Sequence, residues 1–495
     1  MIRNLKLYNS LSREKEDFKP IQEGRIGMYV CGPTVYSDVH LGNCRTFVSF
    51  DIVYRYLLYA GYKVRYVRNI TDVGHLLDDG EDRMSKGARL DQLEPMEVAQ
   101  RYTVGFHDMM QTFNTLAPSI EPRATGHIIE QIKMIEDILA RGFAYEKDGS
   151  VYFNTPKYIA EGNPYGELSG RIIEDLINES RANLKKQDEK NHPADFALWI
   201  KASEEHIMRW PSPWSIGFPG WHLECSAMST KYLGEQFDIH GGGNDLKFPH
   251  HENEIAQSIG ACGKAPSKYW IHTNMLLLNG RKMSKSEGNT ISPMELFTGN
   301  SQHVSKGYSP MTVKFFFLQA HYRSPLDITD EALLGAEKGF KRLMDAVKNL
   351  DSINTEFNSK PGSKDAEIEG LLETSKSHMD DDFNIPNALA TIFELVSTIN
   401  SIKDGHLSGL EINSETWNRL KNHFKSFVLE VFALKNDLDE SSSKSMDGLM
   451  KLILELRKDV RDRKDWSTAD KIRDSLKEAG IQVNDGKEGT SWGFL

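Results

Sequence analysis

The sequence predicts an α/β protein: a Rossmann-type parallel-sheet domain with an insertion, then a helical-bundle domain and a small C-terminal domain. Two observations carry this prediction. Near the N-terminus, a strand–helix–strand pattern has the length and period of a right-handed parallel crossover. From about residue 330 onward, apolar residues recur at helical spacing between charged faces. A chain of 495 residues is also too long for one core.

The crossover is built from three consecutive segments. Residues 25–31 (RIGMYVC) are typical of a short buried strand, and residues 43–60 show helical periodicity. Gly61 follows where a helix C-cap favours glycine, and residues 63–70 (KVRYVRNI) predict the next strand. This order is typical of a nucleotide-binding domain, whose ligands bind beyond the carboxyl ends of the strands.

Shifts in composition divide the rest of the chain. Gly, Pro, Asn and a charge run (KKQDEKNH) indicate an insertion, while a Ser-rich break at 440–443 predicts a linker. Residues 78–92 are polar and predict a surface loop. The predicted divisions are two halves of the sheet domain at 1–120 and 206–275, the insertion at 121–205, a loop and stem region at 276–330, the helical domain at 331–440 and the C-terminal domain at 441–495.

Composition restricts the function classes. Charged residues make up 26% of the chain and hydrophobic residues 39%, as in an ordinary globular enzyme. No signal peptide or membrane span is recognisable, so we expect a cytoplasmic protein. A net charge of −11 argues against a dedicated nucleic-acid protein, although basic strips can still serve an RNA partner. The four cysteines lack a CxxC pair, which favours ligands or nucleophiles over disulfides.

The first motif lies between the first strand and the first helix. His40, Gly42 and Asn43 stand at the expected helix N-terminus, where phosphates bind. His40 and Asn43 supply donors, and Gly42 allows a nucleotide to approach bare backbone. A simple helix-start turn is the alternative interpretation.

The second motif is KMSKS, in a polar loop after a strand. Lys282 and Lys285, with two hydroxyls, suit a clamp on a triphosphate, because an ammonium group can stabilise the charge that develops on pyrophosphate. A solvated basic loop is the alternative, and the look-alike RMSKG at 83–87 shows that one such pentamer is weak evidence.

Together, in this order, the two motifs resemble the HIGH and KMSKS signatures of class I aminoacyl-tRNA synthetases. The chain departs from the first signature at its last histidine, which is Asn43 here. An asparagine still donates a hydrogen bond to phosphate.

A third constellation predicts a metal site. His250 and Glu254 are four residues apart and share a helical face, and Cys31 and Cys225 offer thiolates. Two thiolates, an imidazole and a carboxylate suit tetrahedral zinc. Spacing does not force the cysteines together, buried cysteines with surface histidines remain the alternative, and His251 or His222 competes as a ligand.

A glycine run follows the strand expected at residues 237–240. Gly241, Gly242 and Gly243 predict bare backbone beside the adenosine of ATP, with Asp238 or Asp245 near polar groups of the substrate. A tight strand-end turn is the alternative.

The C-terminal unit predicts RNA contacts. Trp466 offers a stacking surface, while Asp470 and Arg473 lie on the same charged helix. The alternative is a solvated helix with Trp466 in the core.

Longer strings narrow the resemblance. CGPTVY, GWHLECSAMS, DIHGGGNDLKFPHHENEIAQS and KMSKS resemble the cysteinyl-tRNA synthetases over nearly the whole chain, and the GTSWGF ending resembles their anticodon-binding tail. The resemblance implies a zinc ion on Cys31, Cys225, His250 and Glu254, ATP contact by Lys285, and an amino-acid pocket at Thr71 and Trp221.

The resemblance also implies the reaction. A monomeric ligase would activate L-cysteine with ATP and magnesium and transfer it to tRNA(Cys), with zinc selecting the thiol over a hydroxyl. The rival functions are a cysteine ligase for a small amine, of the mycothiol-pathway type, a non-catalytic RNA-binding relative, and a zinc hydrolase. The helical region and the C-terminal unit argue against the first, the retained motifs against the second, and KMSKS against the third.

Overall fold

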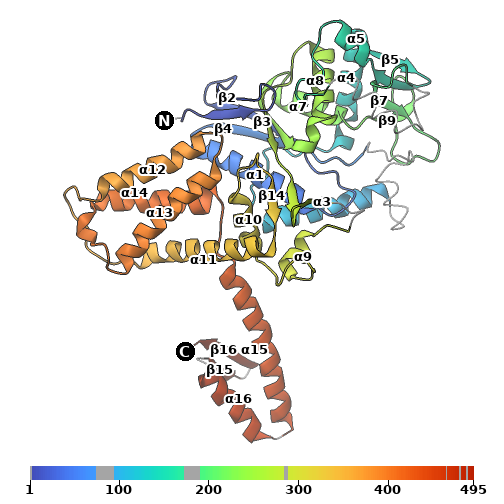
Figure 1. Ribbon diagram of the computed structural model, residues 1–495. Helices are drawn as coiled ribbons and strands as arrows, with labels where there is room; N and C mark the ends of the chain where they lie inside the picture. Colours follow the sequence, from blue (N-terminus) through green and yellow to red (C-terminus); the bar gives the residue numbers. More distant parts are fainter. Residues whose placement is uncertain are drawn as a thin grey trace. The chain divides into compact units, whose positions relative to one another are not determined.

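The computed structural model describes residues 3–73, 94–171, 190–283, 288–463, 465–478, 481–486 and 489–494. It divides into two compact units, residues 1–435 and 436–495. Each is described here by itself, and Figure 1 gives the element labels. In the described part of the chain, no helix is both long and apolar enough to cross a membrane.

The first unit is centred on a parallel sheet with the strand order β11–β10–β3–β4. Its strands are β3 Arg25–Val30, β4 Lys63–Arg68, β10 Phe237–Gly243 and β11 Ser267–Thr273. Helix α1 (Leu41–Tyr59) connects β3 to β4 and ends before Gly61, whose φ of 94° no other residue type adopts as easily. The predicted parallel crossover is therefore confirmed.

Side chains alternate between the two faces of this sheet. On β10, His240 contacts Glu254 of α8 (His250–Cys262), whereas a Cβ on the next residue, Gly241, would meet the Phe50 ring of α1. Helix α7 (Leu223–Leu233) contacts β3 and β4. The faces of β10 are thus covered by α1 on one side and α8 on the other.

The glycine run is part of a strand, so the alternative of a tight turn after a short strand at residues 237–240 is wrong. Strand β10 continues to Gly243, because Gly241, Gly242 and Gly243 each pair with a residue of β11. Ladder pairing here outweighs the low strand preference of glycine.

The region between the halves of the parallel sheet contains an antiparallel sheet with the order β5–β6–β7–β9–β8. Its core is aromatic, with Phe153 stacked on Phe196 and Trp199 fully buried. The sheet continues to Pro219, beyond the predicted division at 205. The elements here are α3 Pro95–Thr112, α4 Ile128–Ala140, β5 Ala144–Lys147, β6 Ser150–Phe153, α5 Thr155–Ala160, β7 Phe196–Lys201, β8 Trp210–Pro211 and β9 Ile216–Pro219.

A small sheet leads into the second motif. Strand β12 (Leu276–Leu278) pairs in parallel with β14 (Leu326–Ile328) and antiparallel with β13 (Arg281–Lys282). Asn279 and Gly280 form the turn between β12 and β13 with φ of 52° and 75°. Further elements of the first unit are the hairpin β1 Lys6–Asn9 with β2 Glu14–Asp17, and the helices α9 Pro293–Thr298 and α10 Pro310–Leu318.

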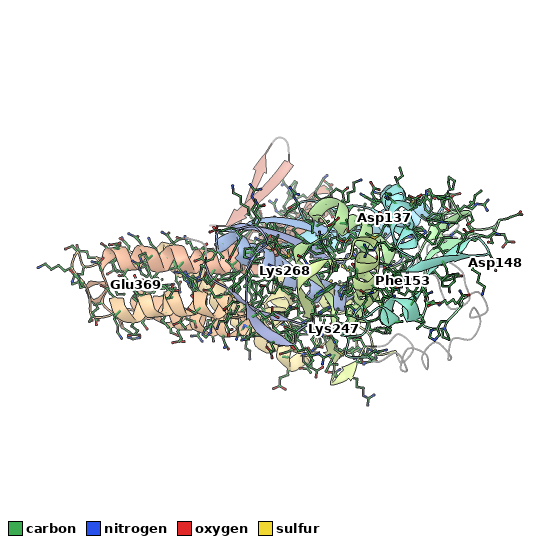
Figure 2. All side chains as sticks on the ribbon, turned by 90° about the horizontal axis from the view of Figure 1, so that it is seen from above. Asp137, Asp148, Phe153, Lys247, Lys268 and Glu369 are labelled. Carbon is green, nitrogen blue, oxygen red and sulfur yellow. The ribbon has the colours of Figure 1, made fainter. Side chains whose placement is uncertain are left out.

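The first unit ends in a helical bundle, where α13 packs on α11 and α12, and α12 also packs on α14. Figure 2 shows Glu369 of this bundle at one end of the first unit and Asp148 of the antiparallel sheet at the other. Asp382, fully buried after α12, accepts hydrogen bonds from Tyr322 and Arg323 and so joins the bundle to the remainder. The helices are α11 Asp330–Ser352, α12 Asp365–Asp380, α13 Ile385–Lys403 and α14 Ser414–Lys425, with a π-helical turn at Ser426–Val431.

The second unit contains two helices and a hairpin in its described residues: α15 Leu438–Asp462, α16 Trp466–Glu478, β15 Ile481–Gly486 and β16 Gly489–Phe494. Its core is formed around Met450, Leu476 and Ile481. The predicted Ser-rich linker at 440–443 is wrong, because these residues lie within α15. Serine costs a helix little, so the helical pattern that follows extends back over it.

Candidate active site and metal centre

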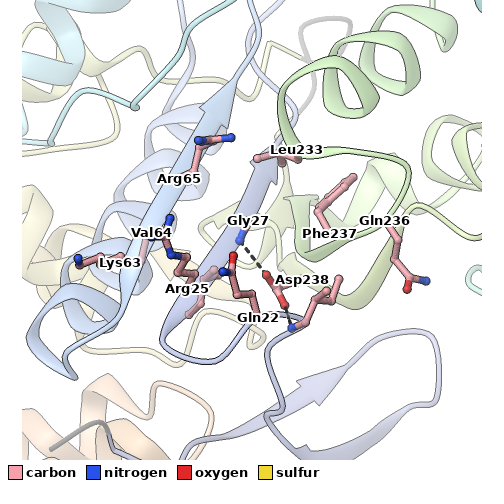
Figure 3. A pocket seen from close by; sticks show the side chains of 12 residues that line it. Gln22, Arg25, Gly27, Lys63, Val64, Arg65, Leu233, Gln236, Phe237 and Asp238 are labelled. Carbon is pink, nitrogen blue, oxygen red and sulfur yellow. Dashed lines mark hydrogen bonds between the residues drawn. The ribbon is translucent and has the colours of Figure 1, made fainter.

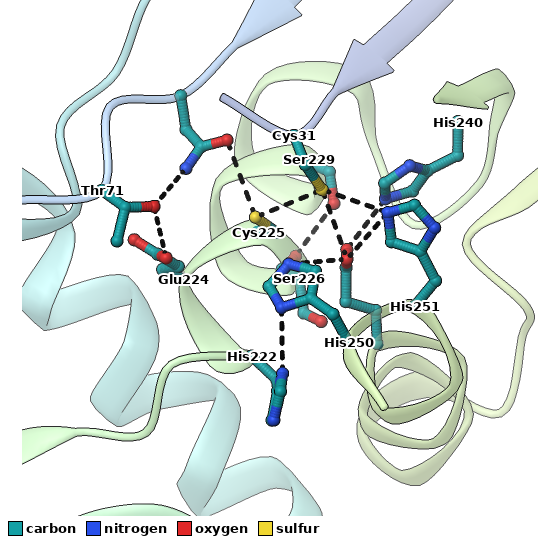
Figure 4. A network of polar contacts seen from close by, with 12 residues as sticks. Cys31, Thr71, His222, Glu224, Cys225, Ser226, Ser229, His240, His250 and His251 are labelled. Atoms are coloured by element: carbon teal, nitrogen blue, oxygen red, sulfur yellow. Dashed lines mark hydrogen bonds and ion pairs between the residues drawn. The ribbon is translucent and has the colours of Figure 1, made fainter. Parts of the chain in front are cut away.

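Four predicted ligands converge at the carboxyl edge of the parallel sheet. Figure 4 labels three of them, Cys31, Cys225 and His250. Cys31 follows the end of β3, and Cys225 lies in the first turns of α7. His250 begins α8, and Glu254 lies one turn later on the same face. All four side chains are buried, and their ligand atoms lie within 4.8 Å of one another. The fold therefore brings the two cysteines to the histidine and the glutamate, which their spacing in the sequence does not require.

The separations of the ligand atoms fit a zinc-sized ion. The Sγ atoms of Cys31 and Cys225 are 3.7 Å apart, and thiolates bound tetrahedrally at 2.3 Å from zinc would be about 3.8 Å apart. The Cys31 Sγ–Glu254 Oε1 distance is 3.6 Å and the His250 Nε2–Glu254 Oε1 distance is 3.2 Å, against about 3.5 Å and 3.3 Å for the same tetrahedron. The donor set and the geometry both suit a structural or substrate-binding zinc.

Burial determines the protonation of these groups. Burial raises the pKa of the Cys225 thiol to about 12 and raises that of Cys31 well above its usual range, so both thiols are neutral at pH 7 unless a cation is bound. A bound cation reverses this preference, since it stabilises thiolate directly. The two thiols are therefore suited to exchange their protons for a metal ion.

A second, overlapping set shares two of the ligands. Cys31, Glu254, His240 and His251 also place their ligand atoms within 4.8 Å of one another. His240 Nε2 lies 2.8 Å from Glu254 Oε2, and His251 Nε2 lies 3.3 Å from Cys31 Sγ. His251 is therefore close enough to the predicted ligands to compete with them. His240 is a further candidate that is not predicted from the sequence, because residues 237–240 are interpreted as the end of a strand.

Further histidines contact the ligands from outside. His222 Nδ1 lies 2.9 Å from His250 Nδ1, and His272 Nε2 lies 2.8 Å from His251 Nδ1. Such contacts fix the orientation and tautomer of a ligating ring. His272 has no sequence signal, because nothing local indicates that the end of β11 lies beside α8.

The predicted amino-acid pocket residues lie beside this group. Thr71 Oγ1 donates to Glu224 Oε1 at 2.6 Å and accepts from Asn69 Nδ2 at 3.0 Å. Asn69 Oδ1 in turn lies 3.6 Å from Cys225 Sγ. The centroid of the Trp221 ring lies 4.8 Å from the centroid of the His250 ring. A chain of polar contacts through Asn69 therefore links Thr71 to the Cys225 thiol.

The first motif forms the N-terminus of α1. His40 is the N-cap: its Nδ1 accepts from Asn43 N at 3.2 Å, while Asn43 Oδ1 accepts from His40 N at 3.4 Å. A Cβ at Gly42 would lie 3.0 Å from the His40 ring. The expected helix-start position is confirmed, and His40 is exposed there while Asn43 is partly exposed.

The second motif is only partly described. Lys282 ends β13 and is exposed. Lys285 lies outside the described residues, as do the look-alike at 83–87 and the polar loop predicted at 78–92.

Protein packing accounts for part of the glycine run. A Cβ at Gly241 would lie 2.3 Å from the Phe50 ring, one at Gly242 would lie 3.0 Å from His251, and one at Gly243 would lie 2.4 Å from Asp245 Oδ1. The contact with the Phe50 ring requires a glycine at 241 whatever ligand binds nearby, whereas the Asp245 side chain could move to admit a Cβ at 243.

Asp238 lies at the opposite edge of the sheet, contrary to expectation. Its carboxylate accepts from Ile21 N at 2.6 Å and from Gly27 N at 2.8 Å. Asp238 lines a pocket of about 310 Å³. Figure 3 shows that Arg25 and Lys63 line the same pocket. Since Asp238 is the second residue of β10, it belongs to the amino ends of the strands and not to the metal-binding edge.

The predicted RNA-contacting residues are on the surface of the second unit. Trp466, which begins α16, is 58% exposed, so the alternative of a core tryptophan is wrong. Asp470 and Arg473 are also exposed, and Arg473 Nη1 lies 3.1 Å from Asp470 Oδ1.

Two family models match the chain. The model for "tRNA synthetases class I (C) catalytic domain" matches residues 17–338, and the DALR domain model matches residues 376–434. The first covers more than half of the chain and includes every predicted metal ligand.

Curated relatives match at high identity. A cysteine–tRNA ligase of Porphyromonas gingivalis is 49% identical over 493 residues, which cover 99% of each chain. The Phocaeicola vulgatus cysteine–tRNA ligase is 51% identical over 500 residues, again 99% of each. The Deinococcus radiodurans cysteine–tRNA ligase is 45% identical over 502 residues, 99% of this chain and 96% of that one.

Solved structures share the fold. Mycobacterium tuberculosis methionyl-tRNA synthetase in complex with methionyl-adenylate has a TM-score of 0.56 at 16% identity, over 82% of this chain and 89% of that one. The Agrobacterium radiobacter LeuRS–tRNA–LeuAMS ternary complex has a TM-score of 0.57 at 12% identity, over 84% of this chain and 85% of that one.

Proposed function

Because the chain belongs to the cysteine–tRNA ligases, a class I synthetase family, we propose that it charges tRNA(Cys) with cysteine that a zinc ion selects by its thiol. The observation that carries the selection step is the convergence of Cys31, Cys225, His250 and Glu254 at tetrahedral spacing.

The reaction has two steps. A carboxylate oxygen of cysteine attacks the α-phosphorus of ATP, the bond to the β-phosphate oxygen breaks, and cysteinyl-adenylate and pyrophosphate form. A terminal ribose hydroxyl of the tRNA then attacks the carbonyl carbon, loses its proton and releases AMP. The protein contributes mainly position and charge stabilisation.

Thiol selection depends on the metal group. When bound, zinc supplies a soft acceptor for a thiolate and a much poorer one for a hydroxyl, whereas a cavity alone separates cysteine from serine weakly. Thr71 and Trp221, both beside this group, would hold the remainder of the amino acid.

The phosphates of ATP would lie between the two motifs. His40 and Asn43, at the N-terminus of a long helix, would hold phosphate oxygens. Lys282 and Lys285 would stabilise the departing pyrophosphate, with magnesium on the same phosphates. Gly42, Gly241, Gly242 and Gly243 would leave room for the nucleotide.

The tRNA would contact the helical domain predicted at 331–440 and the C-terminal domain predicted at 441–495. Trp466 offers an exposed aromatic face for an unpaired base, and Asp470 and Arg473 offer polar groups one turn away. We expect a monomer, with all parts of the site in one chain.

Cysteine-dependent exchange of labelled pyrophosphate into ATP tests the first step. Exchange with cysteine but not serine is expected, and absence of exchange would remove the ligase function. Acylation of purified tRNA(Cys) tests the second step, and a product formed with a small amine but not with tRNA would favour the small-amine ligase instead.

A further inference from the structure

Arg45 is a buried cation two residues after Asn43 in α1. Its side chain is 1% exposed. Among the described residues no carboxylate forms an ion pair with it, and burial alone lowers its pKa to about 10. An arginine in such a place is costly unless its donors are used, so its contacts indicate why it is there.

The guanidinium group binds backbone carbonyls from two separate segments. Nη1 donates to Asn274 O at 3.0 Å and to Met275 O at 2.9 Å. Nη2 donates to His321 O at 3.2 Å and to Ser324 O at 2.6 Å. These are charge-assisted bonds in the planar fork geometry that a lysine cannot reproduce.

Both segments lead directly into the small sheet that contains Lys282, the first residue of KMSKS. Met275 precedes β12, and Ser324 lies two residues before β14, with which β12 pairs. Arg45 therefore binds the residues that precede β12 and β14 and holds both strands against α1, the helix that begins at the first motif.

Short, rigid paths connect these contacts of Arg45 to both motifs. Asn43 lies two residues before Arg45, about 3 Å along the helix axis. In the other direction, Lys282 pairs with Leu277, two residues beyond Met275 and about 7 Å along the strand. The β12–β13 turn is fixed in turn, because the carboxylate of Asp327 accepts from Gly280 N at 2.9 Å.

We propose that Arg45 is a positioning residue that sets the separation between the N-terminus of α1 and the β12–β13 hairpin, and thereby aligns the two phosphate-binding motifs on ATP. This inference rests on the proposed function of Lys282. It assigns to Arg45 no contact with substrate: the residue acts through the carbonyls that it binds.

The variant Arg45→Lys tests this role, because it keeps the charge and most of the volume but loses the fork. We expect the kcat of pyrophosphate exchange to fall roughly tenfold to a hundredfold, as for a small misplacement of reacting groups. The KM for cysteine and the metal content should not change, since the thiol site lies on other elements.

Arg55→Lys is the matched control. Arg55 lies on the same helix and also binds carbonyls of two segments, Glu430 O and Asn114 O, each at 3.0 Å. Neither segment belongs to the small sheet formed by β12, β13 and β14, so Arg55→Lys should retain normal pyrophosphate exchange. Thermal unfolding of both variants separates loss of alignment from loss of fold.

A double-mutant cycle with Lys282→Ala identifies the route. If Arg45 acts through the hairpin, Arg45→Lys should reduce exchange much less in the Lys282→Ala background than in the wild type. Equal reductions in both backgrounds, or equal exchange by Arg45→Lys and Arg55→Lys, would overturn the inference while the ligase function stands. A wild-type protein without cysteine-dependent exchange would instead contradict the proposed function itself.

Discussion

Cys31 Sγ and Cys225 Sγ lie 3.7 Å apart although 194 residues separate them in the chain. This distance is far too long for a disulfide and matches two thiolates on one tetrahedral ion. The relationship depends on β3 ending where α7 begins its first turns.

Cys225→Ala should remove the metal and the preference for cysteine over serine. The purified wild-type protein should contain about one zinc per chain and the variant much less, measured by elemental analysis. Cys262→Ala is the control, because Cys262 lies at the end of α8, outside the metal group, and its sulfur donates to the backbone carbonyls of Ser258 and Lys264. Equal metal content in the two variants would exclude Cys225 as a ligand.

Thr71→Val should weaken cysteine binding. The variant leaves buried polar atoms of Glu224 and Asn69 without their 2.6 Å and 3.0 Å partners, and such a loss costs roughly 1–3 kcal/mol. We expect the KM for cysteine in pyrophosphate exchange to rise about tenfold, with the KM for ATP unchanged. Thr103→Val, which removes a buried hydroxyl from α3, controls for general destabilisation; a similar rise in KM there would refute a pocket role for Thr71.

Gly241→Ala should destabilise the fold. The added Cβ would lie 2.3 Å from the Phe50 ring, and overpacking of this kind costs about 1–3 kcal/mol. The second change Phe50→Leu should recover stability in urea unfolding. If stability recovers but the KM for ATP remains raised, the glycine serves the nucleotide as well as the packing.

His423 should make stability fall with acid. Burial lowers its folded pKa from 6.5 to about 3, so the neutral ring contributes stability that is complete above pH 6.5 and is lost as pH falls towards 3. The slope is about 1.4 kcal/mol per pH unit in that window. His423→Gln, which can still bind Ser375, should lack this component in urea unfolding at several pH values; parallel pH curves for the two proteins would contradict it.

Trp466→Ala should impair tRNA charging alone. Stacking of one base on an aromatic ring is worth about 1–3 kcal/mol, so the KM for tRNA should rise about tenfold while pyrophosphate exchange stays normal. Leu452→Ala, at a site 53% exposed in the same unit, is the matched control. An unchanged KM for tRNA would place the RNA contact elsewhere.

Local pattern predicts the first crossover well, because the period of residues 25–70 and the cap at Gly61 depend on neighbours in the chain. It fails where tertiary pairing decides: the glycines of β10 become strand because β11 lies beside them, and the serines at 441–443 become helix. Neither outcome can be predicted from the neighbouring residues in the sequence alone.

The site shows the same division. The spacing of His250 and Glu254 is local and predicts a shared face, but the approach of Cys31, His240 and His272 depends on the order of the strands. The resemblance to a known family supplied the fourfold set that spacing alone left open. His240 is missed because its neighbours on β10 suggest a strand end.

The positions of the predicted metal ligands along the chain have a consequence for the stability of the protein in the cell. Cys31 follows β3, Cys225 lies in α7 and His250 begins α8, so the three ligands come from segments that are far apart along the chain. An ion gripped by all of them would act as a cross-link that is absent from the unfolded chain, and its binding energy would add to folding energy. Scarcity of metal in a cell would then shorten the survival of newly made copies, apart from any effect on their chemistry.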